Sequence, residues 1–270
     1  MEATMPWTDI TRTEHSRKFV RYPSDLTDAE WSVIKPLVPP CRPGGRPRTA
    51  DMREVLNAIV YVASGGIPWR MLPKDFPPVS TVRGYFYRWR SDGTLALMNY
   101  ALVQEARGLE GKEPCPSAGI IDSQSVRTTE SGGVCGYDAG KKNKGFMVGL
   151  IVHSAGVQDR DGAVPTLQSI RRFYPFLRHI YADGGYAGDK LKQALVGKGQ
   201  WTIEVIRRCD NIKGFKVLPR RWVVERTFAW LGRCRRLAKD WETSIESSTA
   251  WALVAHIRIL IRRLARHCYS

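Results

Sequence analysis

Three acidic residues have the types and surroundings needed for metal-dependent chemistry. Asp122 follows the apolar run Gly119-Ile-Ile, Asp183 follows His179-Ile-Tyr-Ala, and Glu225 lies in Arg221-Trp-Val-Val-Glu-Arg. Both aspartates precede Ser or Gly instead of a basic partner. Carboxylates placed at strand ends can converge and hold divalent cations, which polarise phosphate oxygens. We therefore predict that Asp122, Asp183 and Glu225 bind metal and form the catalytic centre.

The overall charge indicates which substrate such a centre would meet. The 270 residues contain 42 Lys plus Arg against 26 Asp plus Glu, which gives a formal net charge of +16. A chain this basic favours polyanions. The sequence therefore predicts a nucleic-acid phosphate as the substrate.

Several other classes of protein fit the composition poorly. The six cysteines form no Cys-x-x-Cys pair and the five histidines have no metal-finger spacing, so a zinc site is not expected. No apolar run approaches the ~18 residues of a membrane helix, and the first residues lack the apolar core of a signal peptide. We expect a cytoplasmic protein without a membrane partner.

The N-terminal third has the pattern of a small helical domain. Residues 1–25 are expected to form a flexible arm, and residues 26–107 to fold as helices. Thr27-Asp-Ala-Glu30 fits a capping box for a helix from about residue 28 to 36, and Thr49 can cap a second helix that ends near Ser64-Gly65-Gly66. A third helix is predicted from Val79 to Arg90.

These helices resemble a helix-turn-helix reader of DNA, whose last helix enters the major groove. The third helix exposes polar and basic residues, and the Gly/Pro-rich loop before the second helix carries three arginines that can approach a DNA backbone. A helical packing domain with solvated arginines and a plain linker are the structural alternatives. The predicted DNA-binding residues of this region are Arg42, Arg46, Arg48, Thr81, Arg83, Tyr87, Arg88 and Arg90.

Strands and helices alternate in the rest of the chain, beyond a linker over residues 108–117. We expect strands at 119–122, 147–153, 177–183 and 201–206. We expect helices at 165–176, 187–196, 219–241 and 251–266, of which the third carries Glu225. Residues 118–270 are therefore predicted to form one α/β catalytic domain with C-terminal helices.

Several long motifs in one order make the chain resemble bacterial insertion-sequence DDE transposases of the insertion sequence five family. They are Tyr22-Pro-Ser-Asp-Leu-Thr-Asp-Ala-Glu-Trp31, Gly45-Arg-Pro-Arg48, Ile120-Ile-Asp-Ser-Gln-Ser125, Gly156-Val-Gln-Asp-Arg-Asp-Gly-Ala163, Tyr181-Ala-Asp-Gly-Gly-Tyr186 and Trp222-Val-Val-Glu-Arg-Thr-Phe-Ala-Trp230. The resemblance covers nearly the whole length.

The resemblance implies a fold, a reaction and partners. It implies a ribonuclease H-like mixed sheet with helices, in which Asp122, Asp183 and Glu225 hold two Mg²⁺ ions, with Mn²⁺ as an alternative. The implied reaction is cleavage and strand transfer of double-stranded DNA by two-metal catalysis. The implied partners are terminal inverted repeats, target DNA and a second copy of the chain in a homodimer.

Basic residues near the predicted centre extend the expected DNA contacts. Arginines surround Glu225, and a lysine-rich run precedes Met147, so both regions are expected to contact phosphates. Related transposases have a tyrosine and a lysine at the positions of Leu218 and Gly232, and those two roles do not transfer. The predicted DNA-binding residues here are Lys141, Lys142, Lys144, Arg221, Arg226, Arg233, Arg235 and Arg236.

One departure from the family suggests loss of activity. Family members carry an additional strand and turn between the basic run 140–145 and the apolar run 147–152, and here the two are contiguous. Loss of a central strand would leave buried backbone groups unpaired at ~1 to 3 kcal/mol each. The sequence therefore permits a catalytically impaired remnant that only binds DNA, beside an active transposase.

The sequence is also compatible with a related nuclease that cuts DNA without joining it. Each of the three acidic residues has a purely structural explanation as well. Taken singly, Asp122 fits a strand-end turn, Asp183 a Gly-Gly turn, and Glu225 a helical ion pair with Arg221 worth only ~0.2 to 0.5 kcal/mol.

Overall fold

The computed structural model describes residues 20–41, 44, 47–123, 125–127, 136–138, 143–148, 152–154, 157–206 and 227–267. The described helices and 3-10 turns on the N-terminal side are α2 (Asp28–Ile34), η1 (Lys35–Leu37), α3 (Met52–Gly65), η2 (Trp69–Met71), α4 (Val79–Ser91) and α5 (Thr94–Leu109). Those that follow are α6 (Asp159–Ile170), η3 (Gly184–Tyr186), α7 (Asp189–Leu195), η4 (Arg235–Leu237) and α9 (Ile245–His267). The strands are β1 (Ala118–Ile120), β2 (Ser125–Arg127), β3 (Gly136–Asp138), β4 (Asn143–Val148), β5 (Val152–Ser154), β6 (His179–Ala182) and β7 (Thr202–Val205).

The N-terminal helices begin close to where the sequence predicts them. Thr27 and Glu30 form the expected capping box of α2, in which each side chain accepts a hydrogen bond from the other residue's backbone N–H. α3 is capped by Asp51, whose side chain accepts from the Arg53 N–H, and not by Thr49 as predicted. Both Thr and Asp are favourable N-cap residues, so the residue type could not show which of the two caps the helix. Asp51 is the residue directly before Met52, where α3 begins.

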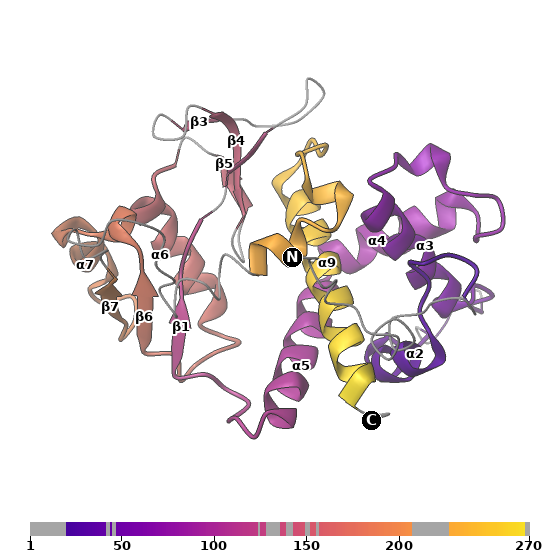
Figure 1. Cartoon of the computed structure of the whole chain (residues 1–270), viewed down its shortest axis with the longest axis horizontal. Helices are drawn as coiled ribbons and strands as arrows, with labels where there is room; N and C mark the ends of the chain where they lie inside the picture. The colour runs from indigo at the N-terminus through magenta and orange to yellow at the C-terminus, as the bar shows by residue number, and fades with distance from the viewer. Residues whose placement is uncertain are drawn as a thin grey trace, which may run out of the picture.

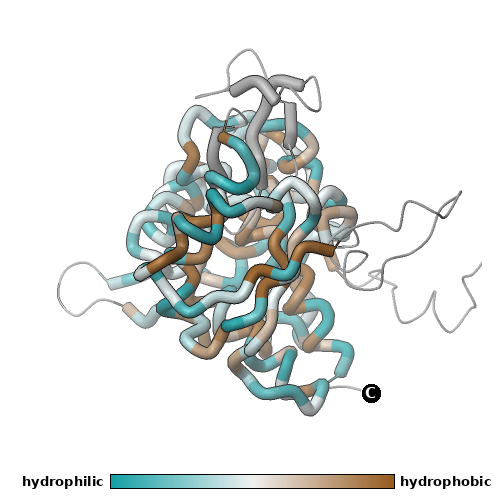
Figure 2. Tube along the Cα trace, turned by 90° about the vertical axis from the view of Figure 1, so that its left-hand side faces the viewer, coloured by the Kyte–Doolittle hydropathy of each residue, from teal (hydrophilic) through white to brown (hydrophobic). Residues whose placement is uncertain are grey.

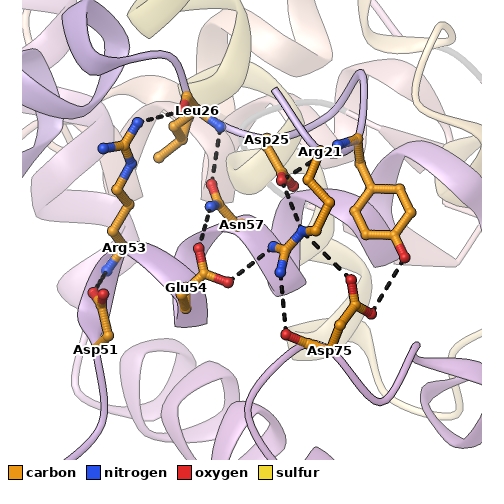
Figure 3. Close-up of polar contacts among 9 residues, drawn as sticks. Arg21, Asp25, Leu26, Asp51, Arg53, Glu54, Asn57 and Asp75 are labelled. Carbon is orange, nitrogen blue, oxygen red and sulfur yellow. Dashed lines mark hydrogen bonds and ion pairs between the residues drawn. The ribbon is translucent and has the colours of Figure 1, made fainter. Parts of the chain in front are cut away.

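The chain before α2 belongs to the folded helical body, which corrects the expected arm over residues 1–25 for its last six residues. The Arg21 guanidinium donates to Glu54 at 2.8 Å and to the Asp75 carbonyl at 3.1 Å, and also pairs with Asp25 (Figure 3). Tyr22 stacks on Phe76 with 5.3 Å between ring centroids. These contacts tie the segment to α3 and to the loop before α4.

Two small sheets lie apart in the strand-containing half (Figure 1). β1, β6 and β7 form a parallel sheet in the order β1-β6-β7, flanked by α6 and α7. β2, β4 and β3 form an antiparallel sheet in that order, and β5 also pairs with β4. The α/β character predicted from the sequence is therefore present as a mixed helical body with a small parallel sheet.

The single strand expected over residues 147–153 is wrong. Met147 on β4 pairs with His153 on β5, so the two ends of that run face each other in antiparallel strands. A glycine at 149 interrupts the apolar run, and an isolated glycine weakens a strand. The apolar run of seven residues is therefore compatible with one strand and with two short antiparallel strands, and its pattern does not distinguish them.

Two predicted helices also have different bounds. α6 begins at Asp159 and not at Pro165, with Asp159 and Asp161 in its first turn, where acidic groups suit the helix dipole. The helix expected over residues 219–241 ends near Leu231, because turns follow it and η4 begins at Arg235. Gly232 occupies the break, and glycine is a poor helix former.

The described residues contain two hydrophobic cores. The smaller lies between the parallel sheet and helices α6 and α7, with Leu167, Ile180 and Leu191 among its most buried members. The larger joins α2, α3, α4 and α5 to the C-terminal helix α9, which runs beside α5 (Figure 1). Figure 2 shows that hydrophobic segments, in brown, alternate with hydrophilic ones, in teal, along the chain.

Candidate active site

Two of the three predicted catalytic residues lie at one edge of the parallel sheet. β1 and β6 are neighbours in parallel register, with Ile120 opposite Tyr181, and the Ile121 N–H donates to the Tyr181 carbonyl at 2.8 Å. Asp122 lies two residues beyond β1, and Asp183 directly follows β6. Because parallel strands end at the same edge, the fold brings both aspartates to that edge.

Each aspartate is fixed by the backbone that follows it. The Ser123 N–H donates to Asp122 Oδ1 at 2.8 Å, and the Gly185 N–H donates to Asp183 Oδ1 at 2.8 Å. Asp183 thereby caps the short turn η3.

A further carboxylate, Asp159, reaches this edge from the first turn of α6. Its Oδ1 accepts a hydrogen bond from the Ser123 hydroxyl at 2.7 Å. A Cβ added at Gly185 would lie 2.9 Å from Asp159 Oδ2 and 3.1 Å from Asp183 Oδ1, so both oxygens border that glycine. Asp159 has no role among the residues predicted from the sequence, because its approach depends on how α6 packs on the sheet.

The Tyr186 side chain is buried beside the acidic residues. Burial, followed by the nearby Asp159 carboxylate, raises the pKa of its hydroxyl, and Asp122 and Asp183 act in the same direction. The nearby Ser123 side chain acts in the opposite direction and lowers this pKa. Three carboxylates therefore surround one neutral phenol.

A pocket of about 530 Å³ opens from this edge toward the helical body. Asp122, Ser123 and Asp159 line one end, and the other walls are mainly apolar. The helical segment 227–231 lines it with Thr227, Phe228 and Leu231.

The opposite wall of the pocket holds a polar pair. His256 of α9 lies with its Nδ1 2.7 Å from the Asn99 side-chain oxygen on α5. Burial lowers the pKa of His256 to about 4, so its ring is neutral at pH 7. The neutral imidazole donates from Nδ1 to the amide oxygen.

The third predicted catalytic residue, Glu225, lies outside the described residues. Among those described, no three His, Cys, Asp or Glu side chains are grouped to hold a metal ion. Asp122 and Asp183 do supply the oxygen ligands that Mg²⁺ prefers. The donor type fits, and completion of a metal site requires a group from another part of the chain.

The exposed face of α4 carries four of the predicted DNA-binding residues as arginine-tyrosine stacks. The Arg83 and Arg90 guanidinium groups lie over the Tyr87 ring at 5.6 Å and 4.8 Å, and Arg88 lies over Tyr85 at 5.4 Å. Arg83 and Arg88 are exposed, whereas Arg90 also donates to the Ser247 hydroxyl of α9 at 2.7 Å. Thr81, also predicted, lies half-buried on the same helix.

The remaining basic residues differ in exposure. Arg233 and Arg235 are exposed, and Arg48 donates to the Pro39 carbonyl. The Arg236 side chain is only 9% exposed, and it pairs with Glu242 and donates to the Ile67 carbonyl. Its guanidinium therefore links η4 to the chain that follows α3. Lys144 lies on β4, and the other predicted residues, Arg42, Arg46, Lys141, Lys142, Arg221 and Arg226, lie outside the described residues.

Aspartates at the ends of two parallel strands, beside a pocket lined by α5, α6, α9 and the helical segment 227–231, define a carboxylate-centred site on a small α/β sheet. The family model described as "Transposase DDE domain" matches residues 113–260, and the chain belongs to that family. The model "Putative transposase of IS4/5 family" matches residues 26–99. The resemblance drawn from the motifs is therefore confirmed.

Individual relatives agree over shorter stretches. A "Putative transposase for insertion sequence element IS402" from Burkholderia cepacia is 34% identical over 100 residues, 34% of this chain and 46% of the relative. An "Uncharacterized protein y4sN" from Sinorhizobium fredii is 33% identical over 81 residues, 30% of this chain and 65% of the relative. The chain thus spans less than two thirds of the length of either relative.

No solved structure matches the chain. Across the described parts of the chain, no helix combines the length and apolar character needed to cross a membrane.

Proposed function

We propose that this chain is an active transposase that binds the terminal inverted repeats of its insertion element and catalyses Mg²⁺-dependent cleavage and strand transfer of DNA. The observation that carries the proposal is the position of Asp122 and Asp183 at one sheet edge, where Asp122 also lines the pocket. Membership in the transposase family supplies the reaction class. A ribonuclease H-like fold and a cytoplasmic location are part of the same proposal.

In this proposal Asp122, Asp183 and Glu225 hold two Mg²⁺ ions. Bound Mg²⁺ would activate the attacking oxygen and stabilise the leaving oxygen of an in-line displacement. The task of the chain is to orient the carboxylates, which the Ser123 and Gly185 amides do for the two aspartates. The apolar pocket walls limit water near the reacting phosphate, which strengthens each electrostatic contact there.

DNA binding is proposed for the basic surfaces and for a homodimer. Exposed Arg83 and Arg88 give α4 the chemistry of a helix that contacts phosphates or base edges, as in a helix-turn-helix reader. Arg233 and Arg235 lie shortly after the pocket-lining segment 227–231, so they can contact DNA close to the proposed centre. We omit Arg236, because its guanidinium is used internally.

The decisive test replaces the proposed ligands one at a time. Asp122→Asn and Asp183→Asn should each reduce Mg²⁺-dependent cleavage of inverted-repeat DNA by more than about 100-fold, because loss of a group that merely orients a metal ligand already costs about 10- to 100-fold. Binding to the same DNA should persist. Asp189→Asn is the matched control, since Asp189 is exposed and lies six residues beyond Asp183.

The same assay separates the transposase from the remnant and from the nuclease. If the unaltered chain binds the repeats but cuts nothing, the impaired remnant is correct. If it cuts but yields no joined products with target DNA, the nuclease is correct. Full activity of either Asn variant would remove that aspartate from the proposed centre.

A further inference from the structure

One motif is not used by the proposed chemistry, although the fold places it at the proposed centre. Within Gly156-Val-Gln-Asp-Arg-Asp-Gly-Ala163, Asp159 begins α6 and points toward the ends of β1 and β6. It contacts both loops that carry the proposed metal ligands. Asp161, two residues away, instead pairs with Lys190 at 3.0 Å on the α7 side.

We infer that Asp159 is a positioning residue that locks the Asp122 loop and the Asp183 loop in one fixed arrangement. It does so by accepting the Ser123 hydroxyl at 2.7 Å with Oδ1 and by packing Oδ2 against Gly185. This inference rests on the proposed function, because the arrangement matters only if the two aspartates act together.

The bond to Ser123 reaches Asp122 through one residue. Ser123 donates its N–H to Asp122 and its hydroxyl to Asp159, so a shift of either acceptor moves the same residue. The buried Tyr186 ends the turn that Asp183 caps. The two loops are therefore joined through Asp159, which accepts from Ser123 and borders Gly185.

The contact at Gly185 closes the arrangement from the other side. The nearest atoms to a Cβ built on Gly185 would be Asp159 Oδ2 and Asp183 Oδ1, so the glycine backbone is the spacer between the two carboxylates. Two like charges at close range repel each other. The position of Asp159 in the first turn of a 12-residue helix offsets part of that repulsion, because the helix N-terminus favours negative charge.

The geometry favours positioning over direct metal ligation. Oδ1 accepts the Ser123 hydroxyl, and Oδ2 borders Gly185, where an added Cβ would lie 2.9 Å from it. Among the residues that the structure describes, Asp159 does not join Asp122 and Asp183 in a metal-binding group. Its effect should therefore depend on a hydrogen-bond acceptor more than on a negative charge.

The test compares Asp159→Ala, Asp159→Asn and Ser123→Ala in the full chain. Asn keeps an oxygen that can accept the Ser123 hydroxyl, whereas the two Ala variants break the bond. We expect cleavage at saturating DNA to fall about 10- to 100-fold in both Ala variants and to stay within about threefold in Asp159→Asn. The double Ala variant should be no slower than the slower single variant, since the two residues act through one bond. Asp161→Asn is the control and should retain normal cleavage.

A second readout needs neither DNA nor Mg²⁺. Hydrogen exchange at the amides of Ser123 and Gly185 should quicken in both Ala variants and remain slow in Asp159→Asn and Asp161→Asn. An Asp159→Asn variant as slow in cleavage as Asp159→Ala would overturn the inference in favour of a charge or ligand role. Unchanged exchange in both Ala variants would overturn the lock itself.

The two readouts also separate this inference from the proposed function. If the unaltered chain cuts no DNA, the proposed function and the catalytic importance of Asp159 both fail, while exchange still reports whether the loops are joined. If Asp122→Asn abolishes cleavage but Asp159→Ala leaves it intact, the proposed centre stands and the positioning role is wrong.

Discussion

At the scale of single residues, the candidate site depends on Gly185, where any side chain would contact two carboxylates. A methyl group at Gly185 would lie 2.9 Å from Asp159 Oδ2 and 3.1 Å from Asp183 Oδ1, whereas one at Gly184 would meet nothing within 4 Å. Gly185→Ala should push these carboxylates apart and slow DNA cleavage by about 10- to 100-fold, because small misplacements are costly in catalysis.

Gly184→Ala is the matched control for this prediction. It adds the same methyl group to the next residue and should change cleavage less than about threefold. Melting temperatures of both variants should be measured beside the rates. Equal loss of activity in the two variants would mean that the turn tolerates no side chain at all, and that spacing of the carboxylates is not the cause.

A second residue-scale prediction concerns pH and His256. Its folded pKa is about 4, below its ordinary value near 6.5, so the unfolded chain binds this proton more readily. Stability should therefore fall as pH drops through 6.5 toward 4, by at most roughly 3 kcal/mol, less if the pocket admits water. His256→Gln should lose less stability than the unaltered chain between pH 7 and pH 5 in urea unfolding.

His267→Gln provides the comparison, since His267 is exposed on the same helix. It should retain the full pH dependence. A carboxylate whose pKa is raised in the folded state, such as Asp240, makes the folded protein more stable as pH falls. This contribution is the same in the unaltered chain and in both variants. Only the difference between variants is therefore diagnostic, and identical slopes would contradict the assignment.

The residues of the site differ in how far the sequence reveals them. The location of Asp122 and Asp183 at one sheet edge was predictable, because each ends an apolar run and the ends of parallel strands meet. Asp159 was not, because its role arises from packing of α6 against Ser123, 36 residues earlier. Arg236 was assigned to DNA by composition, although its partners include the Ile67 carbonyl, 169 residues away. Contacts at such separations leave no local pattern.

At the scale of elements, local chemistry predicted α2 and α4 better than the helices that follow them. The capping box at Thr27 and Glu30 and the helix from Val79 follow from nearby residues. The helix α5 was missed, and the break at Gly232 depends on η4, whose Arg236 reaches back toward α3. Strands of three or four residues carry too few alternations to be counted reliably.

An element-scale prediction follows for α4. Arg83 and Arg88 are exposed and stack on tyrosines that fix their direction. If they contact phosphates, Arg83→Ala and Arg88→Ala should each weaken inverted-repeat binding and lower the slope of log K against log salt by about one. Lys192→Ala, at an exposed position on α7, should leave the slope unchanged. Slopes that do not differ among the three variants would exclude α4 as the DNA-contacting helix.

At the scale of the whole molecule, the helix α9 shares one core with the N-terminal helices. Trp251 of α9 is 1% exposed and stacks on Phe86 of α4 at 4.3 Å, with Trp69 at 5.4 Å. Residues 118–270 were predicted from the sequence to form one domain, but α9 packs with the N-terminal helices. An amphipathic helix shows which face is buried and does not show which partner covers it.

This shared core predicts that a core substitution in α9 also destabilises the N-terminal helices. Trp251→Ala should destabilise the chain by about 3 to 5 kcal/mol, a large part of the roughly 5 to 15 kcal/mol typical of a folded domain. Because the tryptophan packs against α4, hydrogen exchange should quicken throughout α3 and α4 and much less in β6 and β7, which belong to the smaller core.

Trp241→Ala controls for loss of a tryptophan as such, since Trp241 is 43% exposed and lies only ten residues earlier. It should cost less than about 1 kcal/mol and leave exchange in α3 and α4 unchanged. If Trp251→Ala loosened α9 alone, the N-terminal helices would hold together without it. In that case the division at residues 108–117 would separate two independently stable units, and the N-terminal helices would survive removal of the C-terminal helix.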